Sequence, residues 1–191
     1  QAQLTTLGIK GSSDAARREA IEVGIDRLAG MQRYNGGFGL WSKESPEEFW
    51  LTAYVTDFLI RASEQGYSVA PAVLERANQR LLRYLQDENQ IEVYYSNDAA
   101  AVRFSVQAYA ALVLARQQKA PLGMLRALYD KKASAKTGLA RVQLGIALKL
   151  MGDAPRASDL IGEGVNASRP AENLWLEDYG SKLRDNALIL N

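Results

Sequence analysis

Helices that are apolar on nearly every face alternate along this chain with helices that are apolar on one face only. The nearly all-apolar helices are expected at residues 45–65, 98–117 and 137–151, and the amphipathic ones at residues 13–33, 71–87, 121–132 and 153–164. A helix that is apolar all round must be covered on every side, whereas an amphipathic helix needs one covered face. The sequence therefore predicts an all-α fold, an α/α toroid of alternating outer and inner helices built from helical hairpins.

Two details of this pattern are specific enough to test. The run Ser45-Pro46-Glu47-Glu48 is the clearest helix start, with Ser45 as the cap, Pro46 in the first helical position and Glu48 closing a capping box. The helix over 71–87 is expected to turn its arginines outward, at Arg76, Arg80 and Arg83. A helical-repeat solenoid is the competing fold, but the helix pairs are irregularly spaced and show no repeat signature.

Composition removes several classes of function. The chain has no cysteine and no histidine, which excludes disulfides, Cys/His zinc sites and a Ser-His-Asp triad within it. Its formal net charge is +1, with 23 basic and 22 acidic residues, and this balance argues against nucleic-acid binding. No apolar run approaches the roughly 20 residues that span a bilayer, so we expect no membrane insertion. We expect neither a metal nor another cofactor.

Aromatic residues gather in the segments that precede the inner helices. These segments contain Tyr34 to Trp41, then Glu92 to Ser96 with Tyr94 and Tyr95, and then Trp175 to Gly180. In a toroid they lie at one end, where the amino termini of the inner helices converge and their dipoles favour negative charge. The aromatic rings therefore either border a functional site or simply cover the end of the core.

Toroids of this kind also serve as enzymes, so acidic residues near these loops were considered as catalytic groups. An inverting glycosidase needs two carboxylates about 6.5–9.5 Å apart across a cleft. The carboxylates in or near the loops are Glu44, Glu47, Glu92, Glu177 and Asp178. The simpler interpretation is that they are solvated loop charges or helix caps, and we assign no catalytic residue.

Two stretches of the sequence resemble a known family. They are Gln32-Arg-Tyr-Asn-Gly-Gly-Phe-Gly-Leu-Trp41, followed by Phe49-Trp-Leu-Thr-Ala-Tyr-Val55, and Asp178 to Leu190 is a further similar segment. Together they resemble the thioester domain of the alpha-2-macroglobulins, in particular the bacterial, periplasmic proteins of enterobacterial type. The resemblance extends from Leu4 to Leu190.

The resemblance implies a broad-spectrum endopeptidase inhibitor and no enzyme. In that family an attacking protease cuts a bait region, and a Cys-x-Glu-Gln thioester is exposed and acylates the protease. The parent protein would be periplasmic and lipid-anchored to the inner membrane, with attacking proteases and its own other domains as partners. The alternatives that remain are a carbohydrate-active enzyme on a toroid and a helical-repeat scaffold that binds proteins.

The resemblance also predicts where this chain stands in such a protein. By this resemblance the thioester motif should lie shortly before Gln1, and the chain itself contains no cysteine. Residues 1–191 are expected to be a single partial thioester domain, truncated at both ends, with exposed apolar surface near Leu183 to Leu190. The residues expected to line the thioester face are Tyr34, Gly36, Gly37, Phe38, Trp41, Tyr94 and Tyr95.

Overall fold

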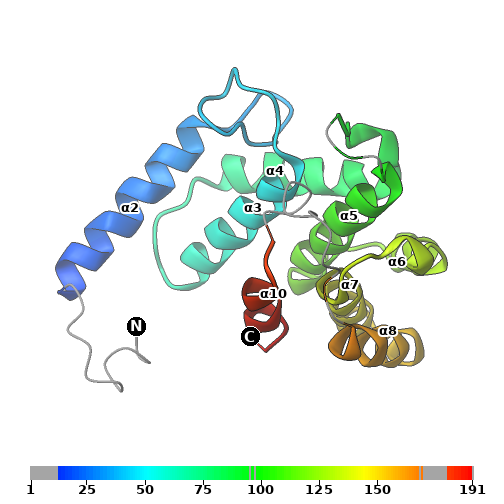
Figure 1. The fold of residues 1–191 in the computed structure, drawn as a ribbon. Helices are drawn as coiled ribbons and strands as arrows, with labels where there is room; N and C mark the ends of the chain where they lie inside the picture. The colour runs from blue at the N-terminus through cyan, green and yellow to red at the C-terminus, as the bar shows by residue number, and fades with distance from the viewer. Residues whose placement is uncertain (1–12, 95, 97, 168, 170–179, 191) are drawn as a thin grey trace.

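The computed structural model describes residues 13–94, 96, 98–167, 169 and 180–190, and the regular structure within them is helical. The α-helices are α2 (Asp14–Gly30), α3 (Phe49–Glu64), α4 (Pro71–Gln86), α5 (Ala99–Arg116), α6 (Leu122–Asp130), α7 (Gly138–Leu150), α8 (Ala154–Asn166) and α10 (Lys182–Leu190). Two short 3-10 turns, η1 (Glu88–Gln90) and η2 (Lys132–Ser134), follow α4 and α6. Figure 1 shows how these helices are arranged.

The inner helices are α3, α5 and α7, and the outer helices α4, α6 and α8 cover them. α5 packs against α3, α4 and α7, and most of its residues are buried, including Phe104 and Leu114. α7 in turn packs against α5, α8 and α10. The outer helices bury one face each, for example through Leu81 of α4 and Leu160 of α8. This is the alternation that the sequence predicts.

Small residues allow α7 and α8 to approach closely. A side chain at Gly138 would collide with the backbone carbonyl of Gly164, and one at Gly145 would press on Ile161. Because interiors are packed nearly as densely as organic crystals, these glycines set the distance between the two helices.

Helix α2 lies at one edge of the molecule (Figure 1). Within α2, Ile25 is the buried residue, and it belongs to a small cluster with Phe38, Leu59, Val73 and others. Ser13 caps the helix by accepting a hydrogen bond from the Ala16 amide at 3.2 Å. The predicted helix over 13–33 is therefore present, although it ends at Gly30.

The predicted capping box at Ser45 is wrong. α3 begins at Phe49, its N-cap is Glu48, and no side chain caps it. Ser45 Oγ instead accepts a hydrogen bond from the Ser42 amide at 3.1 Å, within a turn. The Glu48 amide donates a hydrogen bond to the Phe38 carbonyl at 3.0 Å. The chain before Phe49 therefore pairs with an earlier segment of the loop and does not continue the helix.

The last described helix exposes apolar side chains, as expected near Leu183 to Leu190. Leu183 is 82% exposed and Leu190 is 88% exposed. Within the described residues, no helix is both long enough and apolar enough to cross a membrane. The predicted aromatic segment from Trp175 to Tyr179 lies outside the described residues, as does Tyr95.

Candidate functional site

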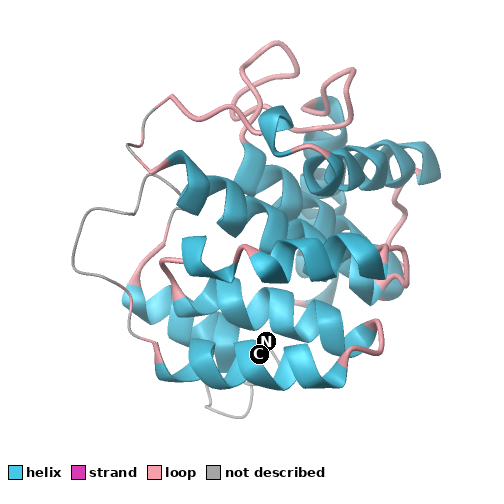
Figure 2. Cartoon of the chain, turned by 90° about the vertical axis from the view of Figure 1, so that its right-hand side faces the viewer, coloured by secondary structure: helices cyan, strands magenta, loops and turns pink. Residues whose placement is uncertain are grey.

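Two long loops lie at the same end of the molecule, as the toroid predicts. The first loop, residues 31–48, joins α2 to α3, and the second loop, residues 87–98, joins α4 to α5. Both stand at the top of Figure 1, at the amino-terminal ends of the inner helices, and Figure 2 shows the longest loops along the upper edge. The described residues predicted to line the site all lie in these two loops.

Buried hydrogen bonds fold the first loop back on itself. Isolated antiparallel bridges join Gln32 to Phe38 and Gly39 to Glu47. The buried Gln32 amide group donates to the carbonyls of Gly36, at 3.2 Å, and Val73, at 2.9 Å. Its oxygen accepts from the Arg76 guanidinium at 2.6 and 3.0 Å. Gln32 therefore joins the loop to α4, and this explains a polar residue in a buried position.

The two glycines that were predicted to line the thioester face serve the packing of this loop. Gly36 has a φ of 93°, which favours glycine, and a side chain there would collide with the Arg76 carbonyl. A side chain on Gly37 would occupy the place of the Glu47 carboxylate. Phe38 is 2% exposed and belongs to the core, with its amide donating to Thr52 Oγ1 at 3.0 Å.

Glu47 and Arg80 form a buried ion pair between the first loop and α4. Their side chains are 6% and 7% exposed. Arg80 Nε donates to Oε1 and Oε2 at 2.9 and 3.1 Å, and Nη2 donates to Oε2 at 2.8 Å. The Asn35 amide group donates to Oε2 at 2.8 Å, and the Tyr84 hydroxyl donates to Oε1. Such a fork-shaped contact fixes both direction and distance.

The surroundings of the pair change its proton affinities. Burial raises the pKa of the Tyr84 hydroxyl well above its usual value, and the negative charge of Glu47 adds to this effect. Burial lowers the pKa of Arg80, but its hydrogen bonds to Glu47 and the negative charge nearby outweigh this effect, so the net shift of the pKa is upward. The guanidinium also lies 4.9 Å from the centre of the Tyr84 ring. Tyr84 therefore stays a neutral donor and Arg80 a cation.

Arg80 also reaches the second loop. Its Nη1 donates to Gln90 Oε1 at 2.9 Å, and its Nη2 donates to the Gln90 carbonyl at 3.3 Å. Directly after η1, the chain is held from the other side, because Arg103 Nε of α5 donates a hydrogen bond to the Ile91 carbonyl at 3.2 Å. One guanidinium therefore touches both loops, one through Glu47 and the other through Gln90.

The predicted aromatic residues separate into one core residue and three exposed ones. Tyr34 is 91% exposed, Trp41 is 78% exposed and Tyr94 is 80% exposed. The Tyr94 hydroxyl donates to Glu92. These three rings present apolar surface at the loop end of the molecule.

The described carboxylates considered for a glycosidase lie in different surroundings. Glu47 is not a solvated charge or a cap, because it is committed to Arg80, and this corrects the sequence-based interpretation. Glu44 and Glu92 are exposed, and the Tyr94 hydroxyl donates a hydrogen bond to the Glu92 carboxylate. Glu177 and Asp178 lie outside the described residues. In the part of the chain that the structure describes, no group of acidic residues is arranged to hold a metal ion.

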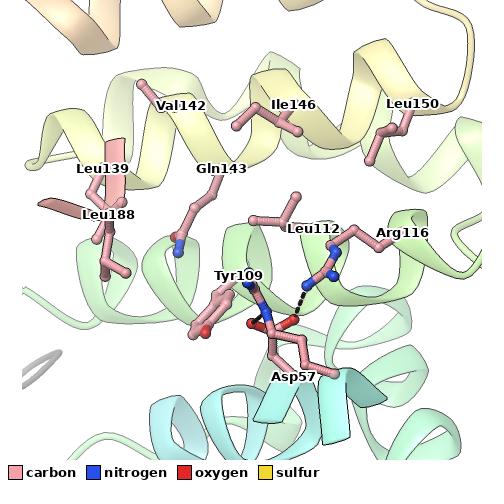
Figure 3. A pocket seen from close by; sticks show the side chains of 11 residues that line it. Asp57, Tyr109, Leu112, Arg116, Leu139, Val142, Gln143, Ile146, Leu150 and Leu188 are labelled. Carbon is pink, nitrogen blue, oxygen red and sulfur yellow. Dashed lines mark hydrogen bonds and ion pairs between the residues drawn. The ribbon is translucent and has the colours of Figure 1, made fainter. Parts of the chain in front are cut away.

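A groove lies between the inner helices, away from the two loops. It has a volume of about 380 Å³ between α3, α5, α7 and α10, with Leu112, Ile146, Leu150 and Leu188 on its apolar side. At one end, Asp57 pairs with Arg61 at 3.0 Å and with Arg116 (Figure 3).

Sequence reasoning missed Arg80, Tyr84 and Gln90. Arg80 was expected on the outward face of 71–87, but it is 6% exposed, whereas Arg76 and Arg83 are exposed as predicted. The helical period does place Arg80 beside the buried Ala77, Leu81 and Tyr84. That position could have indicated that Arg80 is buried. Its partner Glu47 is 33 residues away in the sequence, so no local sequence pattern indicates the ion pair.

Comparison with known proteins identifies the region. No family model matches the chain. Over 191 residues it is 56% identical to the alpha-2-macroglobulin of Escherichia coli (strain K12), a match that covers 100% of this chain and 12% of that protein. The structure of trypsin-activated alpha-2-macroglobulin from Escherichia coli matches with a TM-score of 0.93 and 57% identity, covering 99% of this chain and 13% of that one.

A structure of Salmonella alpha-2-macroglobulin reacted with methylamine also matches, with a TM-score of 0.93 and 57% identity over 99% of this chain and 12% of that one. The chain thus spans about 12% of the length of the curated relative. The all-helical fold is the one that these proteins have in the matching region, which confirms the α/α toroid. With more than half of its residues identical over its whole length, the chain belongs to the bacterial alpha-2-macroglobulins.

Proposed function

We propose that this chain is part of the thioester domain of a protease-trapping inhibitor. The observation that carries the proposal is the 56% identity to an alpha-2-macroglobulin over the whole chain. In the proposed function, a protease cuts a bait region elsewhere in the full-length protein and is then held. This chain acts as a binding and shielding domain and not as an enzyme.

Two relatives support a trap with a reactive thioester. One was activated by trypsin, which is a protease, and another was reacted with methylamine, a small amine nucleophile. A thioester is a bond that such an amine attacks, with release of a thiol. The chain has no cysteine, so in this proposal the thiol comes from a residue of the full-length protein outside these 191 residues.

The loop end is the part of this chain that we propose to lie against the thioester. An acyl group of this kind must be kept from water until it is activated, and apolar rings exclude water. Tyr34, Trp41 and Tyr94 offer such rings on two firmly held loops. We also propose that the parent is periplasmic and lipid-anchored to the inner membrane, which fits an encounter with foreign proteases.

The test uses the intact parent protein. Methylamine is added, and the free thiol and the mass of the protein are measured by titration and mass spectrometry. We expect one thiol released for each amine added, and afterwards a loss of covalent protease capture. No thiol release, combined with a cleaved protein that still protects its bound protease from a large inhibitor, overturns the thioester but keeps the trap. The absence of both overturns the proposed function.

A further inference from the structure

We propose that Arg80 is a positioning residue that sets the two aromatic loops relative to each other and so keeps the thioester shielded. This inference rests on the proposed function. Arg80 does not face the loop surface: it is 6% exposed and projects from the outer helix α4. Its effect on the site is therefore exerted through Glu47 and Gln90.

The contacts of the guanidinium divide between the two loops. Nε and Nη2 hold the Glu47 carboxylate of the first loop at 2.8 to 3.1 Å. Nη1 and Nη2 hold the side chain and the carbonyl of Gln90 in the second loop at 2.9 and 3.3 Å. Because the guanidinium is planar and rigid, fixing one loop on it also fixes the position of the other.

Short paths, one through hydrogen bonds and one along the chain, lead from these contacts to the exposed rings. The Asn35 side chain donates a hydrogen bond to Glu47, and its Oδ1 accepts one from the Gly37 amide at 3.0 Å. The segment that carries Tyr34 is therefore linked to the Glu47 carboxylate. Gln90 stands four residues before Tyr94 in the second loop. A shift at Arg80 is therefore transmitted to Tyr34 and Tyr94 together.

Lysine cannot replace the arginine in this geometry. Its ammonium group is a compact charge whose donors diverge from one atom, so it can satisfy Glu47 but does not reproduce the planar fork that spans Glu47 and Gln90. The Arg80→Lys variant keeps the buried positive charge and removes the link between the loops. Arg80→Lys is therefore a more specific test of the positioning role than a variant without the charge, which would unfold the region.

The experiment measures the rate of thiol release by methylamine in the full-length protein at one pH. Arg80→Lys is expected to raise this rate on the order of tenfold, because misplacing a shielding group by about 1 Å is enough for large changes in reactivity. Gln90→Ala, which removes the side-chain bond to the second loop but keeps the carbonyl contact and the ion pair, is expected to raise the rate less. This variant also serves if Arg80→Lys does not fold.

Two control variants separate positioning from loss of stability. Arg126→Lys changes an arginine of the outer helix α6 that pairs at 2.7 Å with the buried Asp153. Asp153 is the N-cap of α8 and follows the carboxyl-terminal end of α7, so it lies away from the two loops. Leu160→Ala removes a fully buried side chain of α8 and lowers the melting temperature without touching either loop. Neither is expected to change the rate.

The outcomes distinguish this inference from the proposed function. If the unchanged protein releases no thiol, the proposed thioester fails. If it does, and Arg80→Lys and Gln90→Ala both react at the unchanged rate or more slowly, the positioning role of Arg80 is overturned. An equal rise in Leu160→Ala at a matched melting temperature would also overturn it, because it would assign the effect to stability alone.

Discussion

The first loop and helix α5 both pack against α4, but different forces hold them there. α5 is apolar over almost its whole surface, and residues such as Phe104 and Leu114 fill the space around it. The first loop is held by Glu47, Gln32 and Asn35, which are polar and direct their bonds at single atoms. An apolar core tolerates changes of similar volume, whereas a buried polar cluster depends on every partner.

The largest expected effect is at the ion pair. Glu47→Ala should lower the free energy of unfolding by about 3–5 kcal/mol, because it leaves the buried Arg80 charge without its partner. Chemical denaturation of the chain, followed by circular dichroism, measures this. A loss below about 1 kcal/mol would mean that the loop does not depend on its polar contacts, and the comparison would be broken.

A core truncation in α5 provides the apolar side of the comparison. Leu114 is 1% exposed, and Leu114→Ala should cost about 3 kcal/mol through lost burial and the cavity that remains. The same denaturation experiment applies. Leu114→Met, which keeps the volume, should cost less than about 1.5 kcal/mol. If it were as costly as the alanine variant, α5 would be as specific as the loop.

Removing one hydroxyl tests how far the polar cluster depends on each partner. Tyr84→Phe should cost about 2 kcal/mol at neutral pH, because the Glu47 carboxylate loses a buried donor. Burial raises the pKa of Tyr84 in the folded chain, so its stabilising effect is present below the unfolded value of about 10 and is lost as the pH rises above it. The difference between the two proteins should therefore shrink in alkaline solution, and a constant difference from pH 7 to 11 would contradict this.

The smallest effect is expected at the surface of the same loop. Tyr34 is 91% exposed, so Tyr34→Ala should change the free energy of unfolding by less than about 0.5 kcal/mol. Thermal melts of the two proteins should coincide. A clear loss would show that the ring packs within the loop, and it would then be a structural residue and not part of a surface.

The helices could be predicted because their signal is local and repeated. Burial of α3, α5 and α7 on most faces follows from apolar residues at every position of the turn, and the caps at Asp98 and Thr137 act where the pattern begins. The arrangement of the loop could not be predicted in this way. Ser45, Pro46 and Glu48 satisfy the local rules for a helix start, yet the Glu48 amide is used by Phe38.

The end of the molecule at which the aromatic loops lie could also be predicted. Aromatic residues before the inner helices correctly indicated one end of the molecule, since Tyr34, Trp41 and Tyr94 are exposed there. Phe38 could not be told from them by type, although it lies in the core. Whether the exposed rings line a thioester remains a prediction.

The lack of space around Gly37 has a consequence for anyone who wishes to exchange parts between relatives. A side chain on Gly37 would collide with the Glu47 carboxylate, and hydrogen bonds from Arg80 of α4 fix the position of that carboxylate. Residues 31–48 and 71–86 therefore have to be exchanged together, although a whole helix separates them in the sequence. A chimaera that takes the loop from one protein and α4 from another should misfold at this end unless both carry the same glycine, glutamate and arginine.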